Sequence, residues 1–99
     1  MHMVYTIEQI KQITHPIAAA YGIKSMQLFG SYARGEATEL SDVDILIDRG
    51  NIRSGFVLGG LYADLRESLK KELDMVTLQG ADDELLSQIQ KDGVIIYEQ

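Results

Sequence analysis

The sequence predicts an α/β (α+β) fold, in which a small mixed sheet of about three to four strands is packed with helices. Two observations carry this prediction. Short apolar strand signals alternate with helical patterns along the 99 residues, and no linker, repeat or composition shift divides them. A chain of this length builds one hydrophobic core, so a single domain over residues 1–99 is expected.

Composition narrows the class of protein. The chain is 45% hydrophobic and 24% charged, as folded proteins are, and it has no Cys for disulfides or thiolate chemistry. The net charge of −6 opposes a broad phosphate footprint, so direct nucleic-acid binding is not expected. No apolar run reaches membrane-span length and no signal-peptide pattern opens the sequence, which predicts a cytoplasmic protein.

The first helix carries the clearest local signals. Thr6 and Gln9 have the spacing of a capping box, isoleucines then recur at helical spacing, and Gly22 is a natural residue to end the helix. Pro16 conflicts with this pattern because it removes a backbone donor. A kink is favoured over a second short helix, since the apolar stripe runs through the proline.

The remaining signals predict, in order, a strand, a helical turn, a strand, a helix, a strand, a helix and a last strand. These cover residues 23–29, 31–35, 43–48, 56–71, 73–78, 83–90 and 94–97. A polar loop over residues 49–55 precedes the longer helix. Within that helix Glu67 and Lys71 have the spacing of a favourable ion pair.

The candidate site begins with two carboxylates at the start of the strand VDILID. In an extended strand Asp42 and Asp44 project from one face, opposite the apolar residues Val43, Ile45 and Ile47. Neighbouring carboxylates raise each other's pKa, and a divalent cation relieves the repulsion. Mg²⁺ commonly binds one or two carboxylates together with water and phosphate. Alone, the pair is weak evidence, because such pairs are common at solvated strand starts.

Gly30 and Ser31 stand where the first strand gives way to a helical turn. A glycine lets the backbone approach a ligand, and the following N–H groups and the Ser31 hydroxyl can donate to a phosphate. Arg34, about one turn further on, is placed to reach the same phosphates. The alternative is an ordinary turn with Ser31 as the helix N-cap, and one serine can do both.

Asp74 stands inside the third apolar strand, where aspartate is depleted and costly to bury. If that strand lies beside residues 43–48, three carboxylates share one face, where they can hold one or two metal ions and accept a proton from an attacking hydroxyl. The alternative is an aspartate at an exposed strand end. The two histidines, His2 and His15, are too scattered for a histidine-based metal site.

Together these residues resemble a known family. Gly30-Ser31, ten intervening residues and Asp42-Val43-Asp44 are similar to the signature of the polymerase-β-like nucleotidyltransferase superfamily, and Asp74 resembles its third carboxylate. The segment FGSYARGEATELSDVDILID is close to the form seen in minimal nucleotidyltransferases (MNT). The resemblance covers most of the chain and implies the nucleotidyltransferase fold.

The resemblance also implies roles for the residues. The metal and catalytic set is Asp42, Asp44 and Asp74, with one or two Mg²⁺ ions, and the nucleotide set for ATP is Gly30, Ser31 and Arg34. MNT proteins of this kind are type VII-like antitoxins that transfer AMP to a tyrosine of a HEPN-domain RNase toxin and release pyrophosphate. The expected function is therefore a protein adenylyltransferase in a hetero-oligomer with a HEPN toxin. Two alternatives stay open: neutralisation by binding alone, and a small-molecule or RNA acceptor.

Overall fold

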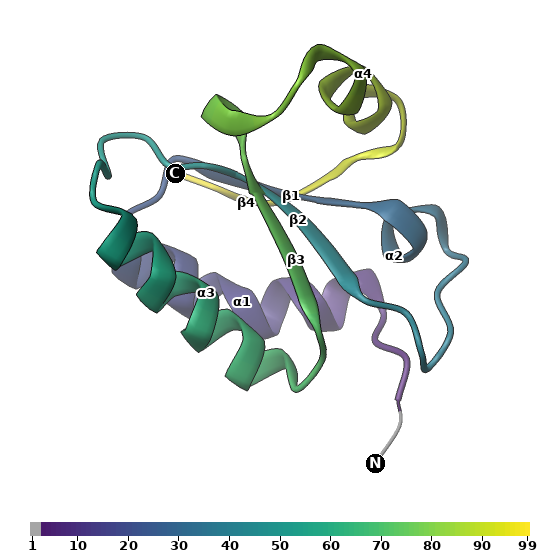
Figure 1. Ribbon diagram of the computed structural model, residues 1–99. Helices are drawn as coiled ribbons and strands as arrows, with labels where there is room; N and C mark the ends of the chain where they lie inside the picture. Colours follow the sequence, from purple (N-terminus) through teal and green to yellow (C-terminus); the bar gives the residue numbers. More distant parts are fainter. Residues whose placement is uncertain (1–2) are drawn as a thin grey trace.

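The computed structural model describes residues 3–99 and shows helices on both faces of a sheet (Figure 1). His2 lies outside the described residues. The elements run in the order α1 (Ile7–Tyr21), β1 (Ser25–Phe29), α2 (Gly30–Arg34), β2 (Val43–Asp48), α3 (Gly55–Leu69), β3 (Leu73–Thr77), a 3-10 turn (Leu78–Gly80), α4 (Asp83–Asp92) and β4 (Val94–Glu98). The alternation of helices and strands predicted from the sequence is confirmed.

The sheet has four strands in the order β3-β2-β1-β4. Strand β1 pairs antiparallel with both β2 and β4, whereas β2 and β3 are parallel. The sheet is therefore mixed, as predicted. The parallel pair is connected by α3, because parallel neighbours need a crossover from one end of the sheet to the other.

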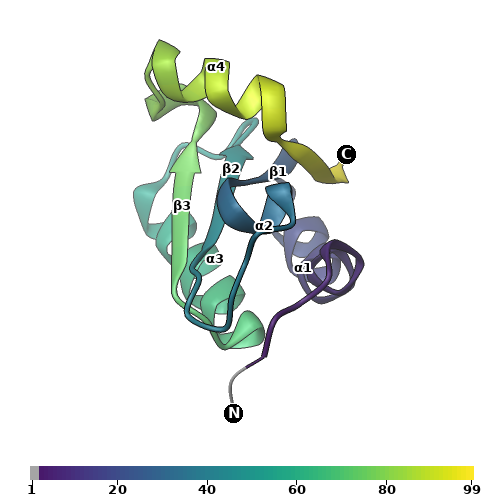
Figure 2. The same cartoon turned by 90° about the vertical axis from the view of Figure 1, so that its right-hand side faces the viewer.

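The main core lies on the face covered by α1 and α3, which run side by side below the sheet in Figure 1. Fifteen buried side chains form it: Ile10, Ala18, Ile23, Met26, Leu28, Tyr32, Val43, Ile45, Ile47, Leu61, Leu65, Leu69, Leu73, Ile96 and Tyr97. On the other face α4 lies above the sheet, and α2 stands at the end of β1 (Figures 1 and 2). Leu46 and Ile89 are also buried but lie outside that cluster.

Local signals in α1 are confirmed in detail. The Thr6 hydroxyl accepts from the Gln9 N–H and the Gln9 side chain accepts from the Thr6 N–H, which completes the capping box. Gly22 ends the helix at a φ of +70°, which glycine adopts without strain. Pro16 lies inside one continuous helix, so a second short helix at that point is excluded.

The end of α3 differs from the prediction. The helix stops at Leu69, so Lys71 lies beyond it and donates instead to the carbonyl oxygen of Glu39, at 3.1 Å. The predicted pair of Glu67 with Lys71 is replaced by an ion pair of Arg66 with Glu72, at 2.6 Å. None of the helices among residues 3–99 is long and apolar enough to cross a membrane.

Candidate active site

The parallel pairing of β2 with β3 places two aspartates side by side. Asp44 and Asp74 are direct partners in the register, each as the second residue of its strand. Their neighbours Val43 and Leu73 belong to the main core, so the pleat directs both carboxylates to the opposite face. Asp44 is half-buried and Asp74 is exposed. The prediction that Asp74 joins the other carboxylates depended on the third strand lying beside the second, and the structure shows that it does.

Asp42 immediately precedes strand β2, as the predicted strand over residues 43–48 implies. Strand β2 begins at Val43, so Asp42 is the last residue of the preceding loop and is exposed. Its charge nevertheless lies close enough to raise the pKa of Asp44. The structure thus brings all three predicted carboxylates to one end of the β2–β3 pair, two from strands and one from a loop.

The electrostatics of this cluster are unfavourable without a cation. Partial burial, followed by the charges of Asp74 and Asp42, raises the pKa of Asp44 to about 6, against a smaller lowering effect of Arg34. Three oxygen-donor side chains with mutual repulsion fit a hard divalent cation such as Mg²⁺. Among residues 3–99 no three such side chains are already grouped closely enough to hold one metal ion.

Gly30 lies directly against this cluster. Its φ is +73°, and a Cβ at this position would collide with Oδ2 of Asp44 and lie 3.0 Å from Cγ of the same residue. Phe29, which precedes it, is the antiparallel partner of Asp44. Only glycine therefore allows the turn from β1 into α2 to pass this close to the carboxylate.

The other residues of the nucleotide set lie on α2. Phe29 occupies the N-cap position and no side chain caps the helix, so the alternative reading of Ser31 as N-cap is wrong. Ser31 is half-buried in the first turn, next to Gly30. Arg34 is exposed, and its Nε donates to Glu36 Oε1 at 2.8 Å. Arg34 also lies close enough to the carboxylates to lower the pKa of Asp44, against the larger raising effects.

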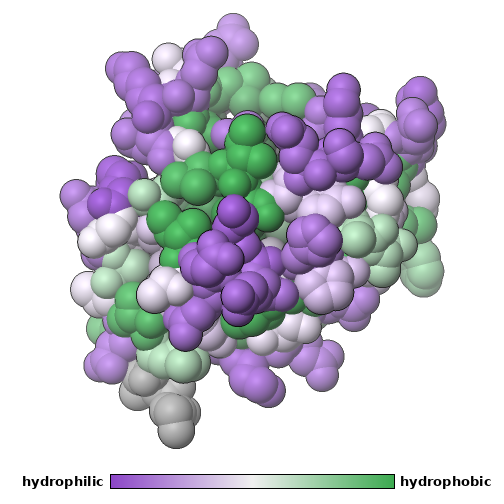
Figure 3. All heavy atoms as spheres, turned by 180° about the vertical axis from the view of Figure 1, so that it is seen from behind, coloured by the Kyte–Doolittle hydropathy of each residue, from purple (hydrophilic) through white to green (hydrophobic). Residues whose placement is uncertain are grey.

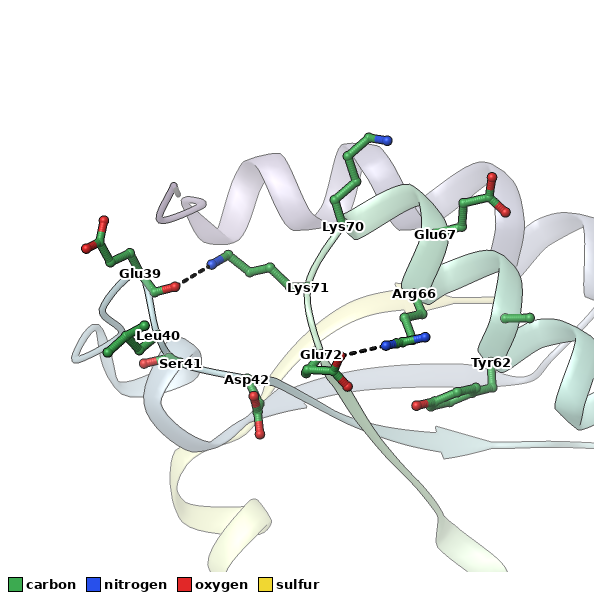
Figure 4. A pocket seen from close by; sticks show the side chains of 11 residues that line it. Glu39, Leu40, Ser41, Asp42, Tyr62, Arg66, Glu67, Lys70, Lys71 and Glu72 are labelled. Carbon is green, nitrogen blue, oxygen red and sulfur yellow. Dashed lines mark hydrogen bonds and ion pairs between the residues drawn. The ribbon is translucent and has the colours of Figure 1, made fainter. Parts of the chain in front are cut away.

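Sequence reasoning missed a groove of about 840 Å³ that Asp42 helps to line. Leu40, Tyr62, Arg66 and Glu72 are among its lining residues (Figure 4). In Figure 4 the Arg66–Glu72 pair lies between Asp42 and Tyr62, and the Asp42 carboxylate points away from Lys71. The one signal in the sequence was an isolated leucine in a polar loop, and Leu40 is 82% exposed.

Comparison with known proteins decides the family. Residues 8–99 match the family described as polymerase beta, nucleotidyltransferase. The chain belongs to this family. The predicted fold and the predicted resemblance are both confirmed.

Sequence relatives of this nucleotidyltransferase carry one activity in their names. A Methanocaldococcus jannaschii protein, provisionally named a protein adenylyltransferase, is 44% identical over 71 residues, which are 72% of this chain and 76% of the relative. The protein adenylyltransferase MntA of Thermococcus cleftensis is 37% identical over 75 residues, with the same two coverages of 72% and 76%.

Solved structures with the same fold include toxin–antitoxin complexes. One, a toxin–antitoxin with AMP-PNP, superimposes with a TM-score of 0.78 over 90% of this chain and 73% of that chain, at 22% identity. Another holds the tri-AMPylated HEPN toxin of Shewanella oneidensis with its MNT antitoxin, and superimposes with a TM-score of 0.73 over 95% of this chain and 74% of that chain, at 19% identity. At these identities the structures show a shared fold.

Proposed function

We propose that this nucleotidyltransferase is a Mg²⁺-dependent protein adenylyltransferase, which transfers AMP from ATP to a tyrosine hydroxyl of a HEPN RNase toxin and so acts as its antitoxin. Residues 1–99 form its single nucleotidyltransferase domain. The observation that carries the proposal is the direct pairing of Asp44 with Asp74, with Gly30 packed against the Asp44 carboxylate. Relatives named protein adenylyltransferases support the choice of a protein acceptor.

Asp42, Asp44 and Asp74 would hold the Mg²⁺, which neutralises charge on the phosphates and on the leaving group. Gly30 brings backbone N–H groups and the Ser31 hydroxyl to the triphosphate. Arg34 reaches the phosphates once it leaves Glu36, and an exposed ion pair of this kind costs at most about 1 kcal/mol to break.

The transfer itself is a single displacement at phosphorus. The tyrosine oxygen forms a bond to the α-phosphorus of ATP, and the bond from that phosphorus to the bridging oxygen of the β-phosphate breaks. Pyrophosphate leaves with the electron pair. Asp74 is the exposed member of the strand pair, so an incoming hydroxyl can reach it and give up its proton there. ATP as substrate and an RNase as partner place the proposed reaction in the cytoplasm.

The test is transfer of label from α-labelled ATP to a HEPN toxin in the presence of Mg²⁺. Wild-type protein should label the toxin, and Asp44→Asn should lower the rate about 100-fold or more, because it removes a metal ligand. Asp48→Asn is a matched control on the same face of β2, where Asp48 Oδ1 accepts from Gly50 and Gln79, away from the cluster. No labelling by wild type, or equal labelling by Asp44→Asn, contradicts the proposal.

Two alternative functions, neutralisation by binding alone and transfer to an acceptor that is not a protein, are tested by further experiments. Rescue of toxin-expressing cells by the double variant Asp42→Asn, Asp44→Asn would show neutralisation by binding alone, whereas loss of rescue supports catalysis. Labelling of a small molecule or of an RNA 3′ end in preference to the toxin would show that the acceptor is not a protein.

A further inference from the structure

Strand β3 forms one margin of the sheet, and its outer side has no partner strand within residues 3–99. The Val43 N–H donates to the carbonyl oxygen of Glu72 at 3.0 Å, which sets the phase of the parallel ladder. Because bonding alternates along a parallel strand, the N–H and C=O groups that face outward belong to Leu73, Met75 and Thr77. These groups are a template for one more strand.

The position of this free edge relative to the carboxylates is the second observation. Asp74 stands between Leu73 and Met75, whose backbone groups face outward, and the Asp74 side chain is exposed. Figure 2 shows β3 at the margin of the sheet, with α2 standing over the side of β1 and β2. A chain that pairs with β3 therefore has Asp74 as its direct neighbour on the site face. Side chains opposite each other on paired strands are about 4.5–5.5 Å apart at Cβ.

The groove supplies the third observation. It opens where α3 turns into β3, and Asp42 lines it as well as belonging to the carboxylate cluster. Tyr62 offers a half-buried ring, while the groove wall carries charges of both signs, including Arg66 and Glu72. The groove thus shares Asp42 with the site, and its mixed lining suits the varied side chains of a peptide segment.

We propose that the outer edge of β3 and this groove receive an extended segment of the acceptor protein, which adds to the sheet as a fifth strand. The acceptor hydroxyl lies on the Asp74 side, and neighbouring side chains of the same segment enter the groove beside Tyr62. This inference rests on the proposed function. It explains how a small chain positions a protein hydroxyl: backbone pairing fixes the distance to Asp74, and the groove selects the register.

The first test removes one outward hydrogen-bond donor. Met75→Pro deletes the outward N–H of Met75 without removing a bond to β2, and proline is tolerated on edge strands. Met75→Leu keeps the N–H and is the matched control. We expect Met75→Pro to raise the KM for the HEPN toxin about tenfold, which corresponds to the loss of one well-made hydrogen bond. Titration of a fluorescent ATP analogue should give unchanged affinity, which also shows that the variant is folded.

A second variant tests the groove without touching the strand. Arg66→Ala breaks an exposed ion pair, so its effect on stability is small. We expect it to raise the KM for the toxin about fivefold, with kcat unchanged. Arg53→Ala, an exposed arginine in the loop at the other end of β2, is the control and should leave KM unchanged.

Amide hydrogen exchange reads the docking directly. In the complex of the Asp44→Asn variant with the toxin, the amides of Met75 and Thr77 should exchange more slowly than in the free protein. Unchanged exchange there, protection at Ile95 on the opposite margin instead, or unchanged KM in both variants would overturn the inference. If wild-type protein labels the toxin in that case, the docking mode alone is wrong. If wild type labels nothing, the proposed function is wrong.

Discussion

The two faces of the sheet differ in what they bury. The face under α1 and α3 carries the fifteen-residue core, in which Ile45 and Leu65 are fully buried. The face under α2 and α4 buries little besides Leu46 and Ile89, and it carries the carboxylate cluster. Seen from behind, hydrophobic surface gathers between α4 and α1, over the margin formed by β4, where Ile95 is 50% exposed (Figure 3).

The two faces therefore have different roles: one stabilises the fold, and the other carries the candidate active site. Burial of apolar area on the α1/α3 face stabilises the fold, because each buried Leu or Ile contributes about 1.5–3 kcal/mol. The other face holds like charges together at the expense of stability, as sites adapted for binding a cation do. Substitutions on the first face should therefore change stability, and those on the second should change activity.

The largest expected effect on stability is in the core. Leu65→Ala on α3 should lower the free energy of unfolding by about 3 kcal/mol, because it leaves a cavity among fully buried neighbours. Leu85→Ala on α4, where the side chain is half-buried, should cost about 1 kcal/mol. Urea denaturation at equal m-values measures both. Equal losses would show that the two faces contribute alike and would contradict the comparison.

Substitution of Gly30 by alanine is expected to lower activity strongly while it lowers stability only a little. An alanine Cβ there meets the Asp44 carboxylate, whose displacement should reduce AMP transfer about 100-fold. Gly35→Ala is a close control: Gly35 has a φ of +74° and open space around its Cβ position. Both variants should lose about 1–2 kcal/mol of stability through the positive φ. Normal activity in Gly30→Ala, or equal loss in Gly35→Ala, would refute the role given to Gly30.

Partial burial of Asp44, together with repulsion from Asp74 and Asp42, predicts a pH-dependent stability. Because the pKa of Asp44 rises from 3.8 to about 6 on folding, the folded state binds more protons between these values, and stability falls as the pH rises through this window. Above about pH 7 Asp44 is ionised in both states, and the free energy of unfolding is lowered by the full amount. After a discount for solvent screening this lowering is about 1–2 kcal/mol.

Asp44→Asn should remove that penalty. We expect the variant to be more stable than wild type by about 1–2 kcal/mol at pH 8 and equally stable at pH 4, while it loses AMP transfer. Thermal unfolding in Mg²⁺-free buffer at the two pH values measures this. A variant less stable than wild type at pH 8 would show that the cluster is not strained.

Local sequence signals predicted the elements better than their arrangement. The strand Val43–Asp48 and the caps of α1 follow from short-range patterns, and the structure reproduces them. Strand order did not follow, because pairing is non-local and the sequence holds no record of which edge β4 joins. The resemblance to a family, rather than periodicity, linked Asp74 to the other two aspartates.

Errors in the local predictions have identifiable causes. Helix α3 ends at Leu69 because Lys70 adopts a left-handed conformation with a φ of 56°, where glycine is usual and the sequence gives no warning. The groove was missed because its walls come from a loop and a helix about 25 residues apart, at Leu40 and Arg66 among others.

Tyr32 joins the two regions and carries the smallest predicted effect. It stands on α2, next to Ser31, but its ring belongs to the main core, so it is not a platform for the base of ATP. Its hydroxyl is buried without a hydrogen-bond partner among residues 3–99, and such a group costs about 1–3 kcal/mol. Tyr32→Phe should therefore stabilise the protein by about 1 kcal/mol without lowering AMP transfer. Tyr5→Phe should destabilise it by about 1 kcal/mol, since the Tyr5 hydroxyl donates to the Leu69 carbonyl oxygen at 2.6 Å. Chemical denaturation of the pair measures the contrast, and a loss of stability in Tyr32→Phe would show that the hydroxyl has a partner.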